Sequence, residues 1–161
     1  MKLKAMLCVG TMLVLAGLAV SVQVQAADDP STGTWKLNVE KSKFDPGPGP
    51  KMQTVTISIE NNTETYKAEG TDASGNPTSS SFSAKLDGTD TPVTGNPYGD
   101  TISIKRVNAH HLTGHLKKDG KDTVTVHVAV SADGKTRTLT ITGKTSDGKA
   151  VHDVEVFDKG M

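Results

Sequence analysis

Asp-Gly pairs in the last third of this 161-residue chain constrain its fold more than any other feature. Asp119-Gly120, Asp133-Gly134 and Asp147-Gly148 follow one another at intervals of 14 residues, between runs that alternate apolar and polar residues. Asp and Gly tolerate the positive φ angles of tight turns, so this arrangement is the strongest local signal for a β-hairpin. A fourth pair, Asp87-Gly88, repeats the pattern earlier in the chain. The sequence therefore predicts an antiparallel β-meander.

After the first 26 residues, the whole chain is typical of short strands separated by turns. Gly, Pro, Thr, Ser and Asp recur every eight to twelve residues, and no segment shows the helical i, i+3, i+4 spacing of apolar residues. The Pro-rich stretch 40–50 is expected to be a long connection, because proline removes donors from a sheet. We predict ten strands, at 33–39, 52–60, 63–69, 79–86, 89–95, 100–107, 110–118, 121–131, 135–145 and 149–158.

The side-chain pattern tests these turns, since facing residues on antiparallel neighbours point to the same side of a sheet. Two-residue turns at Asn61-Asn62 and at three of the Asp-Gly pairs, together with a three-residue loop at 118–120, bring apolar residues to one common face. The predicted facing pairs are Val55–Ala68, Ile57–Tyr66, Phe82–Val93, Val126–Ile141, Val128–Leu139, Leu139–Val156 and Ile141–Val154.

A long meander with one apolar face must hide that face from water, either by closing into a barrel or by folding over as a sandwich. Sequential tight hairpins favour closure, so the predicted fold is all-β, an up-and-down barrel of 8–10 strands. Its expected inward side chains are Trp35, Leu37, Val39, Val55, Ile57, Ile59, Tyr66, Phe82, Leu86, Val93, Ile102, Ile104, Leu112, Leu116, Val124, Val126, Val128, Val130, Leu139, Ile141, Val154 and Val156.

Residues 1–26 have the pattern of a cleavable signal peptide. Lys2 and Lys4 precede an apolar run, and small residues at Val24-Gln25-Ala26 suit a signal peptidase. The segment is too short and too weakly flanked for a stable membrane span. It also contains Cys8, the only cysteine. We therefore expect an exported protein, periplasmic or secreted, whose single domain spans residues 27–161 without disulfides.

The remaining composition excludes several classes of partner. Without the signal segment the chain has 16 basic and 18 acidic residues, a net charge of −2, and no basic stripe for nucleic acid or anionic lipid. No serine lies in a nucleophile elbow, the Asp-Gly acids belong to turns, and no glycine-rich loop precedes a helix. We expect a monomer that is not an enzyme and carries no cofactor.

Gly33-Thr34-Trp35, at the start of the first predicted strand, resembles the Gly-x-Trp signature of lipocalins, whose tryptophan plugs the closed end of the barrel. The segment from GTWKLN to KSKF and PGP is similar to exported bacterial lipocalin-like (calycin-type) proteins of unassigned role, over most of residues 32–159. No Thr-Asp-Tyr motif is found between the expected strands, and no Arg near the last strand is clearly placed over Trp35. The resemblance implies a barrel and a generic ligand-carrier function.

Polar residues on the predicted inward face are the candidates for ligand recognition. Arg106 shares the side of Ile102 and Ile104, where it could meet a ligand carboxylate or instead reach solvent at the strand end. His152 is expected inside, opposite Gly143. Arg137 is expected to pair with Asp158 across strands. The predicted ligand-binding residues are Trp35, Tyr66, Phe82, Arg106 and His152.

The outward histidines offer a weak alternative. His111 and His127 are expected to face each other, with His115 on the same side, but two exposed imidazoles lack a closed ligand set, and we expect no metal site. The leading hypothesis is an exported lipocalin-like barrel with a small apolar or amphiphilic ligand inside. The alternative is a non-catalytic envelope or secreted interaction module with a filled barrel and no ligand.

Overall fold

The computed structural model describes residues 29–160. In this range the chain forms one antiparallel sheet, and no helix is long and apolar enough to cross a membrane. The predicted signal peptide lies outside the described residues. The strands are β1 (Gly33–Leu37), β2 (Met52–Glu60), β3 (Thr63–Thr71), β4 (Pro77–Lys85), β5 (Thr91–Pro92), β6 (Thr101–Asn108), β7 (His111–Lys118), β8 (Lys121–Val130), β9 (Thr136–Lys144) and β10 (Ala150–Lys159).

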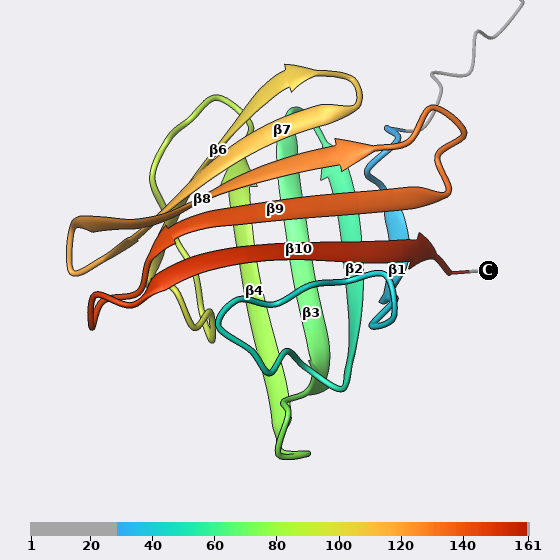
Figure 1. The fold of residues 1–161 in the computed structure, drawn as a ribbon. Coiled ribbons are helices and arrows are strands. Elements are labelled where there is room, and N and C mark those ends of the chain that lie inside the picture. Colours follow the sequence, from blue (N-terminus) through green and yellow to red (C-terminus); the bar gives the residue numbers. More distant parts are fainter. Residues whose placement is uncertain (1–28, 161) are drawn as a thin grey trace, which may run out of the picture.

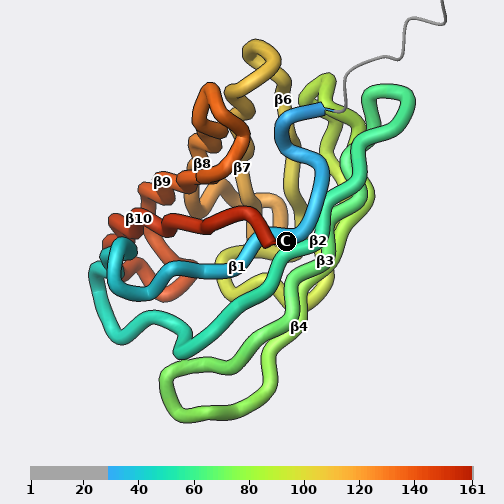
Figure 2. Tube along the Cα trace, turned by 90° about the vertical axis from the view of Figure 1, so that its right-hand side faces the viewer, coloured from blue at the N-terminus to red at the C-terminus, as the bar shows by residue number. Residues whose placement is uncertain are grey.

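The sheet is nearly closed into a barrel, as predicted. Its order is β4-β3-β2-β1-β10-β9-β8-β7-β6-β5, so β1 pairs with both β2 and the last strand, β10. Figure 1 shows β7–β10 crossing β2–β4, and Figure 2 shows the two groups curling toward each other with β1 between them. The structure is a ten-stranded up-and-down barrel of calycin-like architecture.

A seam remains between the two edge strands, β4 and β5. The only bridge across it is Ser81–Thr94, with two backbone hydrogen bonds of 3.0 Å. This bridge keeps the register predicted for Phe82 and Val93, but no full hairpin forms around Asp87-Gly88, and Phe82 instead pairs with Tyr66. Beyond the bridge, Asp87 bridges to Lys105 on β6. The seam is therefore the part of the wall with the fewest ladder hydrogen bonds.

Two of the predicted turns set the registers that the sequence indicated. Asn61 and Asn62 have φ angles of 49° and 58°, the positive values that a two-residue turn between β2 and β3 requires. Ile57 accordingly faces Tyr66, and Val128 faces Leu139 across the Asp133-Gly134 turn. These register predictions are confirmed.

The register predicted for β10 is wrong by one residue. The loop before β10 uses three residues, 146–148, between Thr145 and Lys149, with Gly148 at φ 87° in its last position. Leu139 therefore faces Glu155, not Val156, and Ile141 faces Asp153, not Val154. Because side chains alternate along a strand, this shift turns the whole of β10 over. Asp153, Glu155 and Phe157 point inward, and Val154 and Val156 point outward.

The turn between β7 and β8 also differs from the prediction, but without changing the buried face. Asp119 and Gly120 form a tight turn, and the register shifts between His115 and Lys117 at a bulge. The bulge sets two residues of β8, Thr123 and Val124, against Leu116 of β7, so the same side chains stay on the inner face as in the predicted register. Leu112 and Leu116 stay inside, as predicted.

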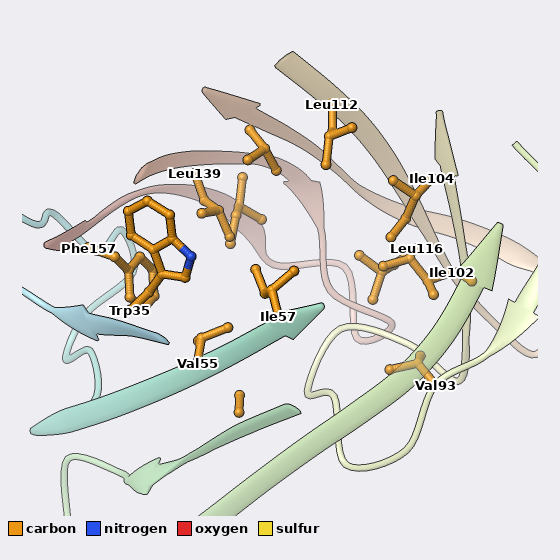
Figure 3. Close-up of a cluster of buried hydrophobic side chains, with 14 of the residues drawn as sticks. Trp35, Val55, Ile57, Val93, Ile102, Ile104, Leu112, Leu116, Leu139 and Phe157 are labelled. Carbon is orange, nitrogen blue, oxygen red and sulfur yellow. The ribbon is translucent and has the colours of Figure 1, made fainter. Parts of the chain in front are cut away.

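Buried hydrophobic side chains from most of the strands meet inside the barrel (Figure 3). Most of the predicted inward residues are buried, and Trp35, Val55 and Ile57 are at most 2% exposed. Val39 is an exception at 45% exposed, because β1 ends at Leu37. The buried hydrophobic residues are Trp35, Val55, Ile57, Ala68, Ala84, Leu86, Val93, Ile102, Ile104, Leu112, Leu116, Val124, Val128, Val130, Leu139, Ile141, Val151 and Phe157.

The depth of this core predicts the cost of removing one side chain from it. Ile57→Ala should lower the free energy of unfolding by about 2–5 kcal/mol, because it removes buried methyl groups and leaves a cavity. Val107→Ala is the control, since Val107 is 63% exposed and its truncation should change stability by less than about 0.5 kcal/mol. Urea denaturation measures both. Equal effects would contradict the assigned inner and outer faces.

Candidate functional site

The barrel interior contains a cavity of about 70 Å³ behind the seam. Its walls come from β3 and β4 on one side and from β6–β9 on the other, and Asn96 from the loop before β6 closes it. Most lining side chains are aliphatic or aromatic, and the exceptions are one amide and two charged groups. The lining residues are Glu64, Tyr66, Phe82, Asn96, Ile102, Ile104, Leu112, Gly114, Val126, Val128, Arg137 and Leu139.

Two of the predicted ligand-binding residues, Tyr66 and Phe82, line this cavity together. They face each other on β3 and β4, and their rings stack with centroids 4.7 Å apart and planes 3° from parallel. Stacked aromatic rings contribute about 0.5–1.5 kcal/mol beyond the area they bury. The pair therefore forms a firm apolar wall beside the seam.

Trp35, a third predicted ligand residue, is fully buried but does not line the cavity. Its indole N–H donates to the Ser31 carbonyl oxygen at 2.9 Å, and the Lys159 ammonium lies 4.8 Å from the ring centroid. A cation over an indole face is favourable. Trp35 thus packs at one end of the barrel, where Lys159 of the last strand covers it.

Arg106 and His152 do not line the cavity either. The Arg106 guanidinium forms an ion pair with Asp29 at 2.6 Å, and its side chain is 24% exposed. The predicted inward orientation of His152 is wrong, because the shifted register of β10 places it opposite Thr142 on the exposed face. Val151 instead occupies the inward position opposite Gly143.

Two charged residues do line the cavity, Glu64 and Arg137. Neither was among the predicted ligand-binding residues. Glu64 is 1% exposed and Arg137 is 2% exposed. The predicted pairing of Arg137 with Asp158 is wrong, since Arg137 faces Phe157 and Asp158 faces Thr136. Strand alternation could have found Glu64, because it lies two residues before the inward Tyr66.

Polar atoms of both side chains are buried without a hydrogen-bond partner. These atoms are Oε2 of Glu64 and Nε and Nη1 of Arg137. Burial raises the pKa of Glu64 above its usual value, and the nearby Arg137 charge opposes this effect only in part. Burial likewise raises the pKa of the Tyr66 hydroxyl, which stays protonated.

β10 adds two further carboxyl groups to the interior. Asp153 is 4% exposed and accepts hydrogen bonds from the Tyr98 hydroxyl at 2.7 Å and from the Asp45 N–H at 2.8 Å. Glu155 is partly buried, and desolvation together with the neighbouring Asp153 charge raises its pKa to about 7. The register predicted for β10 placed both carboxyl groups on the outer face, so neither was predicted to be inside.

The histidines do not form the arrangement that the sequence suggested. His111 faces Ala129 and His127 faces Thr113, because the two-residue turn and the bulge in β8 each shift the predicted register by one residue. Both imidazoles are on the exposed face. In residues 29–160, no group of three potential ligands from His, Cys, Asp and Glu comes together to hold a metal ion.

The unpaired buried groups of Glu64 and Arg137 suit a small molecule with polar groups of its own. Hydrogen bonds and charges act more strongly inside a protein than in water, and unpaired buried groups carry a cost that a bound molecule can relieve. No protein-family model matches the chain, and a search of curated proteins finds no relative. The assignment of a function therefore depends on the geometry of this interior.

The raised pKa of Glu155 predicts how stability depends on pH. The folded state holds this proton more tightly than the unfolded chain, so the group favours folding below about pH 4.5 and loses this contribution as the pH rises toward 7. Glu155→Gln should remove part of that decline and raise stability at pH 8 by roughly 2 kcal/mol relative to wild type. Urea denaturation from pH 4 to pH 8 measures the difference. The exposed Glu69→Gln serves as the control, and a parallel shift in both variants would contradict the prediction.

Proposed function

We propose that the protein is an exported, monomeric, lipocalin-like carrier that binds a small apolar or amphiphilic molecule in its barrel interior. Gly33-Thr34-Trp35 on the first strand and Lys159 over the indole ring support the lipocalin-like assignment. The signal-peptide pattern of residues 1–26 supports export. Nothing in this proposal requires catalysis.

The observation that carries the proposal is the cavity itself. Ligand sites are typically apolar hollows with a few convergent polar groups, and this cavity has aliphatic walls, the stacked Tyr66–Phe82 pair and two unpaired charged groups. The ligand site of the proposal is therefore Tyr66, Phe82, Glu64 and Arg137. Trp35, Arg106 and His152 do not belong to it.

The volume limits the size of the ligand. Sites for drug-sized molecules measure about 300–1,000 Å³, and an engineered apolar cavity of about 150 Å³ binds benzene. A cavity of about 70 Å³ suits a molecule of a few heavy atoms. A carrier for long lipid chains would need a rearranged interior.

The seam provides a route of entry. Phe82 of β4 and Asn96 line the cavity close to the Ser81–Thr94 bridge. Parting the strands there breaks two backbone hydrogen bonds, whereas β2–β3 and β8–β9 are joined by unbroken ladders. Passage of a ligand through the seam therefore costs less than passage between those strands.

One observation favours the alternative function, a non-catalytic envelope or secreted module. The cavity is only about 70 Å³, and Trp35 and Phe157 are almost completely buried at one end. If the alternative function is correct, the cavity contains only water, and the outer faces or the long loop 38–51 contact a partner. The two functions differ in whether the interior binds anything other than water.

Filling the cavity tests the proposed function. Gly114 lines it, and an added Cβ would meet its nearest neighbour, the Ser103 carbonyl oxygen, at 3.6 Å, an ordinary contact. Gly114→Ala should therefore preserve or increase stability while reducing ligand binding several-fold. Native mass spectrometry of protein purified from the organism that encodes it should show a bound small molecule in wild type and less of it in this variant.

The control for this experiment is Thr113→Ala, which alters the outer side of the same strand. It should leave the bound molecule in place. If repeated preparations of wild-type protein carry no molecule and bind no small apolar probe, the proposed function is wrong and the alternative stands.

A further inference from the structure

Glu64 and Arg137 form an open pair of opposite charges across the cavity. Both side chains line the same hollow, one from β3 and one from β9. The Arg137 charge lowers the pKa of Glu64 against the effect of burial, and the charges of Asp29 and Arg106 also act on this carboxyl group. Yet among residues 29–160 no ion pair joins Glu64 and Arg137. Both charged groups therefore border the cavity without forming an ion pair with each other.

Without a bound molecule, two buried charged groups that lack hydrogen-bond partners lower the stability of the folded state. Burying a charged group without hydrogen bonds is unfavourable, and truncated or separated buried pairs are strongly destabilising. Glu64 can reduce its cost by taking up a proton, but a guanidinium cannot give up its proton in a protein. Oε2 of Glu64 offers an acceptor, while Nε and Nη1 of Arg137 offer donors. A partner that fits must therefore supply a donor and an acceptor at once.

The charge balance restricts that partner further. A simple amine would add a positive charge beside Arg137 and leave its N–H groups unpaired. A simple carboxylate would add a negative charge beside Glu64 and leave Oε2 unpaired. Glu155 and the hydrogen-bonded Asp153 already supply negative charge on the neighbouring strand β10. A molecule that carries both charges can pair with both residues and leaves the net interior charge unchanged.

We propose that the cavity binds a small zwitterion whose ammonium group donates to Glu64 and whose carboxylate accepts from Arg137. This inference rests on the proposed function, because it names the ligand class of the same interior site. In an α-amino acid the two charged groups are attached to one carbon, which suits a single small hollow between two opposite charges. A short apolar side chain then packs against Val126, Leu139 and the Tyr66–Phe82 stack. The volume of about 70 Å³ selects the smallest members of this class.

A matched set of four probes tests the ligand class on the full-length mature protein. L-Alanine carries both charges, ethylamine lacks its carboxylate, propionate lacks its ammonium group, and 1-propanol is an uncharged molecule of similar size. Titrations followed by NMR should show L-alanine binding at least about tenfold more tightly than any of the other three, since each charged hydrogen bond inside the barrel discriminates by about that factor or more. The shifted signals should include the Arg137 Nε–H and the methyl groups of Val126 and Leu139.

Variants assign each end of the ligand to its residue. Glu64→Gln should weaken L-alanine about tenfold and remove its advantage over propionate. Arg137→Met should weaken L-alanine by a similar factor and remove its advantage over ethylamine. Lys67→Gln is the control, because Lys67 lies on the outer face of β3, its side chain is 62% exposed, and its change should leave all four affinities unchanged.

The wild-type probe series separates the failure of this inference from the failure of the proposed function, even if a variant does not fold. If 1-propanol, ethylamine or propionate binds as tightly as L-alanine, the interior is a ligand site but the zwitterion assignment is overturned. If none of the four probes binds, the cavity contains water only, and both the inference and the proposed small-ligand function are overturned.

Discussion

The pairing of β1 with both β2 and β10 is the constraint on which the rest of the structure depends. β1 is only five residues long, but it joins the first part of the meander to the last and thereby closes the sheet around its apolar side. Trp35 lies at this junction, opposite Val55 on one neighbour and Lys159 on the other. Its complete burial removes a large apolar surface from water at the point where the two ends of the described chain meet. The cavity exists because this closure brings β3 and β9 within reach of one enclosed space.

The interior combines a core that stabilises the fold with a mostly apolar cavity that contains two unpaired charged groups, and these groups do not stabilise the fold. The aliphatic side chains and the aromatic residues bury their surface in the ordinary way. Glu64 and Arg137 act against this, because a buried open charge pair is less stable than an apolar replacement of the same volume. Local departures from the rules that favour folding are typical of functional sites. This contrast is why the cavity with its two charged groups, and not the barrel shape alone, supports the proposed binding function.

Sequence patterns predicted the strands well because turn residues and alternation are local properties. The paired asparagines at 61–62 adopt the expected positive φ angles and set the register of β2–β3, and the Asp133-Gly134 turn sets the register of β8–β9. The β9–β10 loop was wrong because Asp-Gly is compatible with two-residue and three-residue loops alike. That single residue reversed β10, so Asp153 and Glu155 were assigned to the solvent and His152 to the interior. Tyr66 was placed inside by the Asn61-Asn62 turn and Phe82 by the register around Asp87-Gly88, whereas their pairing across β3 and β4 was not predicted.

The order of turns, the alternation of residues and the Gly-Thr-Trp start were enough to specify an antiparallel meander with one apolar face, since each depends on interactions between residues close together in the chain. Closure through β1, the seam between β4 and β5, and the meeting of Glu64 with Arg137 were decided only in three dimensions. Glu64 and Arg137 are 73 positions apart in the sequence, and no local pattern relates their side chains. Their proximity follows from how far the sheet curls, which is set by the packing of the whole core.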